Sequence, residues 1–86
     1  MPDAVTVPVL VRLFARYAEL LGSESVTVRL GADSTVADLV SGVRALPGGN
    51  ALPGRVLVAR GLEQVRYDQA VRPGDEFAFL PPMSGG

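Results

Sequence analysis

The sequence predicts an α+β fold built from a mixed sheet of about five strands, one principal helix and one short helix. Runs of β-branched and aromatic residues lie near both ends of the chain, and an apolar stripe at helical spacing lies between them. With 86 residues, of which 48% are hydrophobic, the chain is long enough for one domain with a modest core. We place this domain at residues 1–80, including a disordered leader over 1–7, and a flexible tail at residues 81–86.

The first predicted strand covers residues 8–14. Its side chains alternate between two faces, as the twofold period of a strand requires. One face is entirely apolar and is expected in the core: Val9, Val11 and Leu13. The other face carries a charge and is expected to meet water or a partner: Leu10, Arg12 and Phe14.

A short helix and a second strand follow. Residues 15–21 are good helix formers, and Gly22 stands where a left-handed residue commonly ends a helix. Because this helix has only about two turns, it must pack on the rest of the domain to be stable. Residues 25–30 alternate between apolar and polar side chains, which predicts a half-buried strand.

The principal helix begins at Thr35, which can cap the first turn. Asp38 stands three residues later, as in a capping box. An apolar stripe then follows at steps of three and four residues: Val36, Leu39, Val40, Val43 and Leu46. The sequence Pro-Gly-Gly at 47–49 ends the helix, and a loop is expected over 48–54.

The last third of the chain predicts three more extended segments. A strand covers residues 55–60, a short extended stretch covers 63–67, and the last strand covers 76–80. The sequence Arg-Pro-Gly-Asp at 72–75 favours a type II turn before this last strand.

This order of elements describes a β-grasp, or ubiquitin-like, roll. In that arrangement the first and last strands lie side by side and parallel, and the principal helix covers one face of the sheet. The opposite face would carry Phe14, Leu80 and Arg12. These side chains either form an open docking surface or are covered by the short helix or a loop, and the sequence leaves both alternatives open.

The chain ends on a short segment that is unsuited to packing. Pro81 and Pro82 stop the last strand, because proline offers no N–H to a sheet ladder, and they favour an extended path. Residues 81–86 could reach roughly 20 Å when fully extended. Met83 and Ser84 are followed by a Gly-Gly ending that can thread a narrow channel. A frayed end without function is the alternative interpretation.

The composition argues against most enzyme chemistries. The chain contains no Cys, His or Lys, so thiolate nucleophiles, histidine bases, zinc–thiolate sites and Schiff bases are all excluded. A net charge of −1 argues against nucleic acid or an anionic membrane as a partner. No membrane span or signal peptide is visible, which favours a cytoplasmic protein. A carrier is therefore more plausible than an enzyme.

Several short motifs resemble one family over nearly the whole chain, from Val9 to Gly86. They are Phe-Ala at 14–15, Glu-Leu-Leu-Gly at 19–22, Thr-Val-Ala-Asp-Leu at 35–39, Gly-Asp-Glu at 74–76, and Phe-Leu-Pro-Pro-Met-Ser-Gly-Gly at 79–86. The sequence resembles the small subunit of molybdopterin synthase, the MoaD-type sulfur carriers, and the ending is the most specific of these motifs. The leader before Pro8 and the Ala-Arg-Gly sequence at 59–61 depart from the family pattern.

This resemblance implies a covalent carrier that binds no cofactor itself. A ubiquitin-activating-type adenylyltransferase, using ATP and Mg, would adenylate the Gly86 carboxylate, and a sulfur donor protein would supply the sulfur of a thiocarboxylate. The tail would then enter the large subunit of molybdopterin synthase and give sulfur to cyclic pyranopterin monophosphate. The tail residues in that channel would be Pro81, Pro82, Met83, Ser84 and Gly85. The docking residues of the globular body would be Phe14, Leu80 and Arg12.

Other functions remain compatible with these residues. The chain could carry sulfur for tRNA thiolation, cysteine synthesis or thiamine synthesis. It could also be a ubiquitin-like modifier that is joined through Gly86 to lysines of target proteins. A third possibility is a β-grasp module that binds partners non-covalently and whose tail is inert.

Overall fold

The computed structural model describes residues 6–81. The strands are β1 (Thr6–Leu13), β2 (Ser25–Gly31), β3 (Leu57–Arg60), β4 (Glu63–Gln64) and β5 (Glu76–Leu80). The helices are α1 (Ala15–Leu21), α2 (Val36–Arg44) and the 3₁₀ helix η1 (Gly49–Ala51). Their arrangement confirms the predicted β-grasp fold, with five strands in one mixed sheet.

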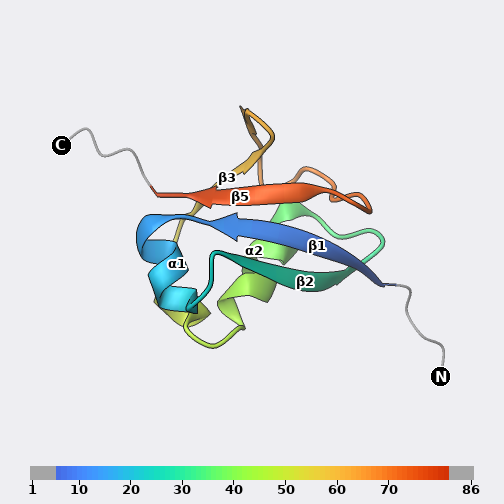
Figure 1. The fold of residues 1–86 in the computed structure, drawn as a ribbon. Helices are drawn as coiled ribbons and strands as arrows, with labels where there is room; N and C mark the ends of the chain where they lie inside the picture. The colour runs from blue at the N-terminus through green and yellow to red at the C-terminus, as the bar shows by residue number, and fades with distance from the viewer. Residues whose placement is uncertain (1–5, 82–86) are drawn as a thin grey trace, which may run out of the picture.

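The sheet has the strand order β2-β1-β5-β3-β4. The first and last strands lie side by side at its centre and run parallel, as Figure 1 shows in blue and red. Their register pairs Leu10 with Glu76 and Leu13 with Phe79. β1 also pairs antiparallel with β2, and β5 pairs antiparallel with β3. The strand that leads into the C-terminal residues is therefore held between two neighbours.

The core lies between the sheet and α2. The apolar stripe predicted for this helix is buried at Val36, Leu39, Val40 and Val43, and it faces inward side chains of the strands. Those side chains include Val9, Val11, Leu13, Val28, Val58, Phe77 and Phe79. At the start of α2 the Asp38 carboxylate accepts a hydrogen bond from the backbone N–H of Thr35 at 2.9 Å. The predicted cap thus fixes where the helix begins.

The short helix α1 has the predicted bounds. It ends at Gly22, which takes the left-handed conformation with φ of 73°. Tyr17 of α1 is buried in the core, and the helix contacts η1. The segment predicted as a loop over 48–54 contains the helical turn η1. Just after this turn, the carbonyl oxygens of Leu52 and Pro53 accept hydrogen bonds from the Arg44 guanidinium group.

Some strand boundaries differ from those predicted. β1 begins at Thr6 and pairs with β2 from Thr6 onward, so a disordered leader reaching residue 7 is wrong for Thr6 and Val7. Residues 1–5 lie outside the described part of the chain. β3 begins at Leu57 rather than Arg55. The extended stretch at 63–67 is a strand only over Glu63–Gln64.

Candidate functional site: the open sheet face and the tail root

The sheet face opposite α2 carries an apolar groove of about 420 Å³. It is lined by Phe14, Leu57, Ala59, Gly61, Leu62, Gln64, Ala78 and Leu80. Along β3 and β5, side chains that point into the core alternate with side chains that line the groove. The same two strands therefore build both the core and the groove. We call this feature the open-face groove.

The structure brings together two of the three predicted docking residues. Phe14 and Leu80 both line the open-face groove, although they belong to segments 66 positions apart in the chain. Phe14 is 45% exposed, and α1 turns toward the other side of the sheet, where Tyr17 is buried. Of the two alternatives left open by the sequence, the open face is therefore the one observed among the described residues.

Arg12, the third predicted docking residue, does not line this groove. It lines a smaller hollow beside it, together with Phe14, Gly61, Glu76, Phe77 and Ala78. The Arg12 Nε atom donates to the Glu76 carboxylate at 2.7 Å, and both side chains are about half exposed. Arg12 is thus paired within its own chain, at the edge of the apolar surface.

Leu62 is the most exposed apolar side chain on this face, and the sequence analysis did not identify it. It sits in the turn between β3 and β4, after Gly61, whose φ is 64°. Its side chain is fully exposed, whereas turns usually place polar residues there. The sequence signal that could have identified this residue is a single leucine placed directly after the turn glycine Gly61. An exposed leucine beside an apolar groove is typical of a docking surface.

The point where the chain leaves the sheet has a groove of its own. β5 ends at Leu80, and Pro81 is the last described residue. An apolar pocket of about 320 Å³ adjoins Pro81 and is lined by Arg16, Tyr17, Leu20, Ala51, Pro53 and Pro81. We call it the tail-root groove. The other predicted tail residues lie outside the described part of the chain: Pro82, Met83, Ser84, Gly85 and Gly86.

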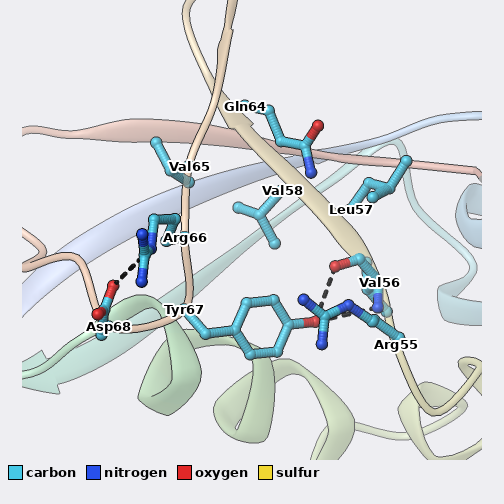
Figure 2. Close-up of a pocket in the computed structure, with 9 residues that line it drawn as sticks. All are labelled: Arg55, Val56, Leu57, Val58, Gln64, Val65, Arg66, Tyr67 and Asp68. Atoms are coloured by element: carbon cyan, nitrogen blue, oxygen red, sulfur yellow. Dashed lines mark hydrogen bonds and ion pairs between the residues drawn. The ribbon is translucent and has the colours of Figure 1, made fainter.

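A third pocket, of about 430 Å³, lies between β3 and the segment that follows β4. Figure 2 shows that the Tyr67 ring forms one side of it and that its hydroxyl reaches the backbone of Val56. That hydroxyl donates to the Val56 carbonyl oxygen at 2.7 Å and accepts from the Val56 N–H at 3.0 Å. The Arg55 guanidinium lies 5.4 Å from the centre of the Tyr67 ring. Tyr67 therefore takes the place of a strand partner where β4 is too short to provide one.

The described residues offer little of their own for catalysis. Within residues 6–81, no group of three His, Cys, Asp or Glu side chains is placed to hold a metal ion. In the same range, no helix is long and apolar enough to cross a membrane. The Tyr17 hydroxyl is buried without a hydrogen-bond partner among these residues, and burial raises its pKa. A neutral, buried phenol is poorly placed to act as a base.

Comparison with known proteins places the chain in a family. The family model described as ThiS matches residues 11–86. The chain is 38% identical to small archaeal modifier protein 1 of Haloferax volcanii, covering 87% of this chain and 97% of that protein. A crystal structure of SAMP1 from the same organism superposes with a TM-score of 0.79 at 33% identity, covering 92% and 99% of the two chains. The structure of a putative molybdopterin converting factor subunit 1 from Pyrococcus furiosus shares the fold, with a TM-score of 0.79 at 23% identity over 90% and 99%. The chain therefore belongs to the ThiS family of ubiquitin-like carriers and modifiers.

Proposed function

We propose that this chain is a cytoplasmic sulfur carrier of molybdopterin synthesis, with sulfur held on Gly86 as a thiocarboxylate. The observation that carries this proposal is the path of β5. This strand runs along the open-face groove through Ala78 and Leu80 and continues directly into residues 81–86. A partner that docks on the groove would therefore find the Gly-Gly tail next to its binding surface. The ending over residues 79–86 favours molybdopterin as the product.

Activation of the tail requires a partner enzyme, because a carboxylate is a poor acyl donor. A carboxylate oxygen of Gly86 attacks the α-phosphorus of ATP, pyrophosphate leaves, and an acyl adenylate forms. A hydrosulfide equivalent from a sulfur donor protein then attacks the acyl carbon, and AMP leaves with the electron pair of the broken C–O bond. Loss of a proton gives the thiocarboxylate.

The Gly86 thiocarboxylate then transfers its sulfur to the pterin. In the large synthase subunit the thiocarboxylate sulfur displaces an oxygen substituent from a carbon of cyclic pyranopterin monophosphate, so that a C–S bond forms while a C–O bond breaks and its electron pair leaves with the oxygen. Water then cleaves the resulting thioester, so that sulfur stays on the pterin and the Gly86 carboxylate is restored. Because the sulfur is carried on the main chain, the absence of Cys from the sequence is no obstacle.

The second candidate function is protein modification, and the comparisons favour it specifically. The curated relative that is 38% identical over most of both chains is named as a modifier protein. In that case the amino group of a target lysine would attack the acyl carbon of activated Gly86 and form an amide bond. This chain has no lysine, so it could not extend itself into a polymer through lysine side chains.

Mass spectrometry of the C-terminal peptide distinguishes these functions. The protein should be incubated with its activating enzyme, ATP, Mg²⁺ and a sulfur donor, with a chain lacking Gly86 as the matched control. Exchange of one oxygen for one sulfur on the wild-type peptide, absent from the control, is the expected result. Amide-linked adducts on target lysines would favour modification instead. An unmodified tail with full reagents would refute both functions.

The product of sulfur transfer needs its own test. A carrier-null strain that expresses the wild-type chain should regain molybdenum-enzyme activity, whereas the same strain expressing the chain without Gly86 should not. Recovery of activity without Gly86 would contradict the carrier mechanism. A thiocarboxylate that forms in vitro but restores no molybdenum-enzyme activity would mean that another pathway receives the sulfur.

A further inference from the structure

Strand β2 forms one edge of the sheet, because the strand order is β2-β1-β5-β3-β4 (Figure 1). The backbone N–H of Leu13 donates to the carbonyl oxygen of Glu24 at 2.8 Å, in the same register that pairs Arg12 with Ser25. Hydrogen-bonded and non-hydrogen-bonded pairs alternate in an antiparallel ladder, so every second residue of β2 directs its backbone groups toward β1. The residues between them direct their N–H and C=O groups away from the sheet: Ser25, Thr27, Arg29 and Gly31.

Both ends of this outward row are closed by local hydrogen bonds. The Ser23 hydroxyl donates to the Ser25 carbonyl oxygen at 2.7 Å and accepts from the Ser25 N–H at 3.4 Å. At the other end, the Gly31 carbonyl oxygen accepts from the Ser34 N–H at 3.2 Å. Backbone groups that already have partners gain little from binding a further strand. The row is therefore open only between Ser25 and Gly31.

Two residues of the row remain open, and we call residues 27–29 the open edge. Within residues 6–81, no hydrogen bond reaches the outward N–H and C=O groups of Thr27 and Arg29. Sheet edges are commonly protected by a proline or by a charged side chain that guards the edge. Here the Arg29 Nε atom donates to the Thr6 hydroxyl of β1 at 3.3 Å, so its charge is held over the sheet. The open edge is thus free to accept another strand.

A second copy of the same strand fits the open edge in one register. A two-fold axis perpendicular to the sheet keeps each side chain on its own face, so one residue of β2 must lie directly opposite its own copy. With Val28 in that position, Thr27 of each copy lies opposite Arg29 of the other. These two pairs form four backbone hydrogen bonds. The bonds use all the open groups and none of the capped ones.

The neighbouring two-fold registers are less favourable. An axis at Thr27 would require the capped groups of Ser25 to bind Arg29 of the second copy. An axis at Arg29 would require the capped carbonyl of Gly31, and it would place the two Arg29 side chains directly opposite each other. Like charges in that position destabilise a strand pair. With the axis at Val28, each Arg29 lies opposite an uncharged Thr27 instead.

We propose that two copies of this chain associate through β2, antiparallel and about a two-fold axis at Val28, into a dimer with one continuous sheet. The open-face groove and Pro81 lie toward β3 and β5, separated from β2 by β1, so both copies would keep them accessible on the same face. This inference goes beyond the proposed function and does not require it. Because few backbone hydrogen bonds hold the dimer, it should form near millimolar concentration and dissociate at micromolar concentration.

Sedimentation equilibrium of the full chain, from micromolar to millimolar concentration, measures the Kd of the dimer. Substitutions of Thr27 test the register, because this residue lies opposite Arg29 of the second copy. Thr27→Glu should lower the Kd about two- to thirtyfold through two new ion pairs, and Thr27→Lys should raise it by a similar factor. Asn50→Glu and Asn50→Lys are the matched controls, since they change the net charge equally at an exposed position of η1. They should change the Kd by less than about twofold, because distant exposed charges are screened.

Thr27→Pro tests the hydrogen bonds themselves, because proline removes an outward N–H that the chain's own ladder does not use. It should raise the Kd about tenfold or more while circular dichroism shows a folded domain. If this variant does not fold, the comparison of Thr27→Glu with Thr27→Lys decides the question without it.

Two results would overturn the inference. A wild-type chain that stays monomeric at millimolar concentration would leave the open edge to an extended segment of another protein. Equal Kd values for Thr27→Glu and Thr27→Lys would place the contact between the two copies on another surface. Neither measurement involves adenylation of Gly86, so failure here is distinguishable from failure of the proposed function.

Discussion

The hydroxyl of Tyr67 supplies the hydrogen bonds that a longer β4 would have given to Val56. It donates to the Val56 carbonyl oxygen at 2.7 Å and accepts from the Val56 N–H at 3.0 Å. Val56 is only 1% exposed, so water has little access to these backbone groups. The substitution Tyr67→Phe would remove both bonds while it kept the ring under Arg55. A buried N–H and a buried C=O would then lack partners.

The size of the effect can be worked from these two bonds. Each hydrogen bond contributes about 0.5–1.5 kcal/mol net, and a buried group left without a partner costs about 1–3 kcal/mol. We expect Tyr67→Phe to lower the free energy of unfolding by about 2–3 kcal/mol. For a domain of this size, such a loss lowers Tm by roughly 10–20 °C. Urea unfolding followed by circular dichroism measures it directly, and the m-value should be unchanged.

Tyr17→Phe is the matched control, because it removes the same hydroxyl group from a site where it forms no bond. The Tyr17 hydroxyl is buried without a partner among the described residues, and the side chain is 3% exposed. Its removal should leave stability unchanged or raise it by up to about 1 kcal/mol. A loss below about 0.5 kcal/mol for Tyr67→Phe, or a larger loss for Tyr17→Phe than for Tyr67→Phe, would refute this account of the β3 edge.

Three further predictions concern a turn, a pH dependence and the docking face. At Gly48, where φ is 87°, a Cβ would lie 2.0 Å from the Leu20 carbonyl oxygen, so Gly48→Ala should lower the free energy of unfolding by about 3 kcal/mol or more. The control is Gly54→Ala, where a Cβ would meet open space and the free energy of unfolding should change by less than about 0.5 kcal/mol. Equal unfolding midpoints for the two variants would contradict this prediction. Burial raises the pKa of Tyr17 above its ordinary value of 10.0, so the unfolded chain releases this proton first, and the stability that the neutral phenol contributes should be lost as pH rises above about 10. In urea titrations from pH 9 to 11, Tyr17→Phe should lose less stability than the wild type, and parallel losses would exclude the effect. Leu80→Asp should weaken binding to the large synthase subunit about tenfold or more, as measured by calorimetry, and an unchanged Kd would remove Leu80 from the docking face.

Much of the fold could be predicted from local signals. The bounds of α1 follow from helix-forming residues and Gly22, and the start of α2 follows from Thr35 and Asp38. The turn at 72–75 was likewise readable, and Gly74 has the positive φ, 84°, that a type II turn requires. In each case the deciding residues lie within a few positions of the feature.

The features that the sequence did not reveal depend on distant partners. β3 begins later than its composition indicates, because Tyr67 rather than a strand binds Val56. Arg12 remains a predicted docking residue, but its ion pair with Glu76, 64 positions away, depends on a strand register that no local pattern specifies. Leu62 follows a turn glycine like an ordinary turn residue, and only the three-dimensional arrangement places it on the open-face groove that Phe14 and Leu80 also line.

The central pairing of β1 with β5 has a consequence for how the protein matures. Strands from opposite ends of the chain must meet before the middle of the sheet can form, and contacts of such long sequence separation slow folding. Because β5 follows every other strand of the sheet in the chain, the sheet cannot close before β5 has been synthesised and has left the ribosome. The strand that completes the fold is also the strand that continues into the tail. A folded docking face and a presented tail should therefore arise together, which would keep unfinished chains from engaging partners.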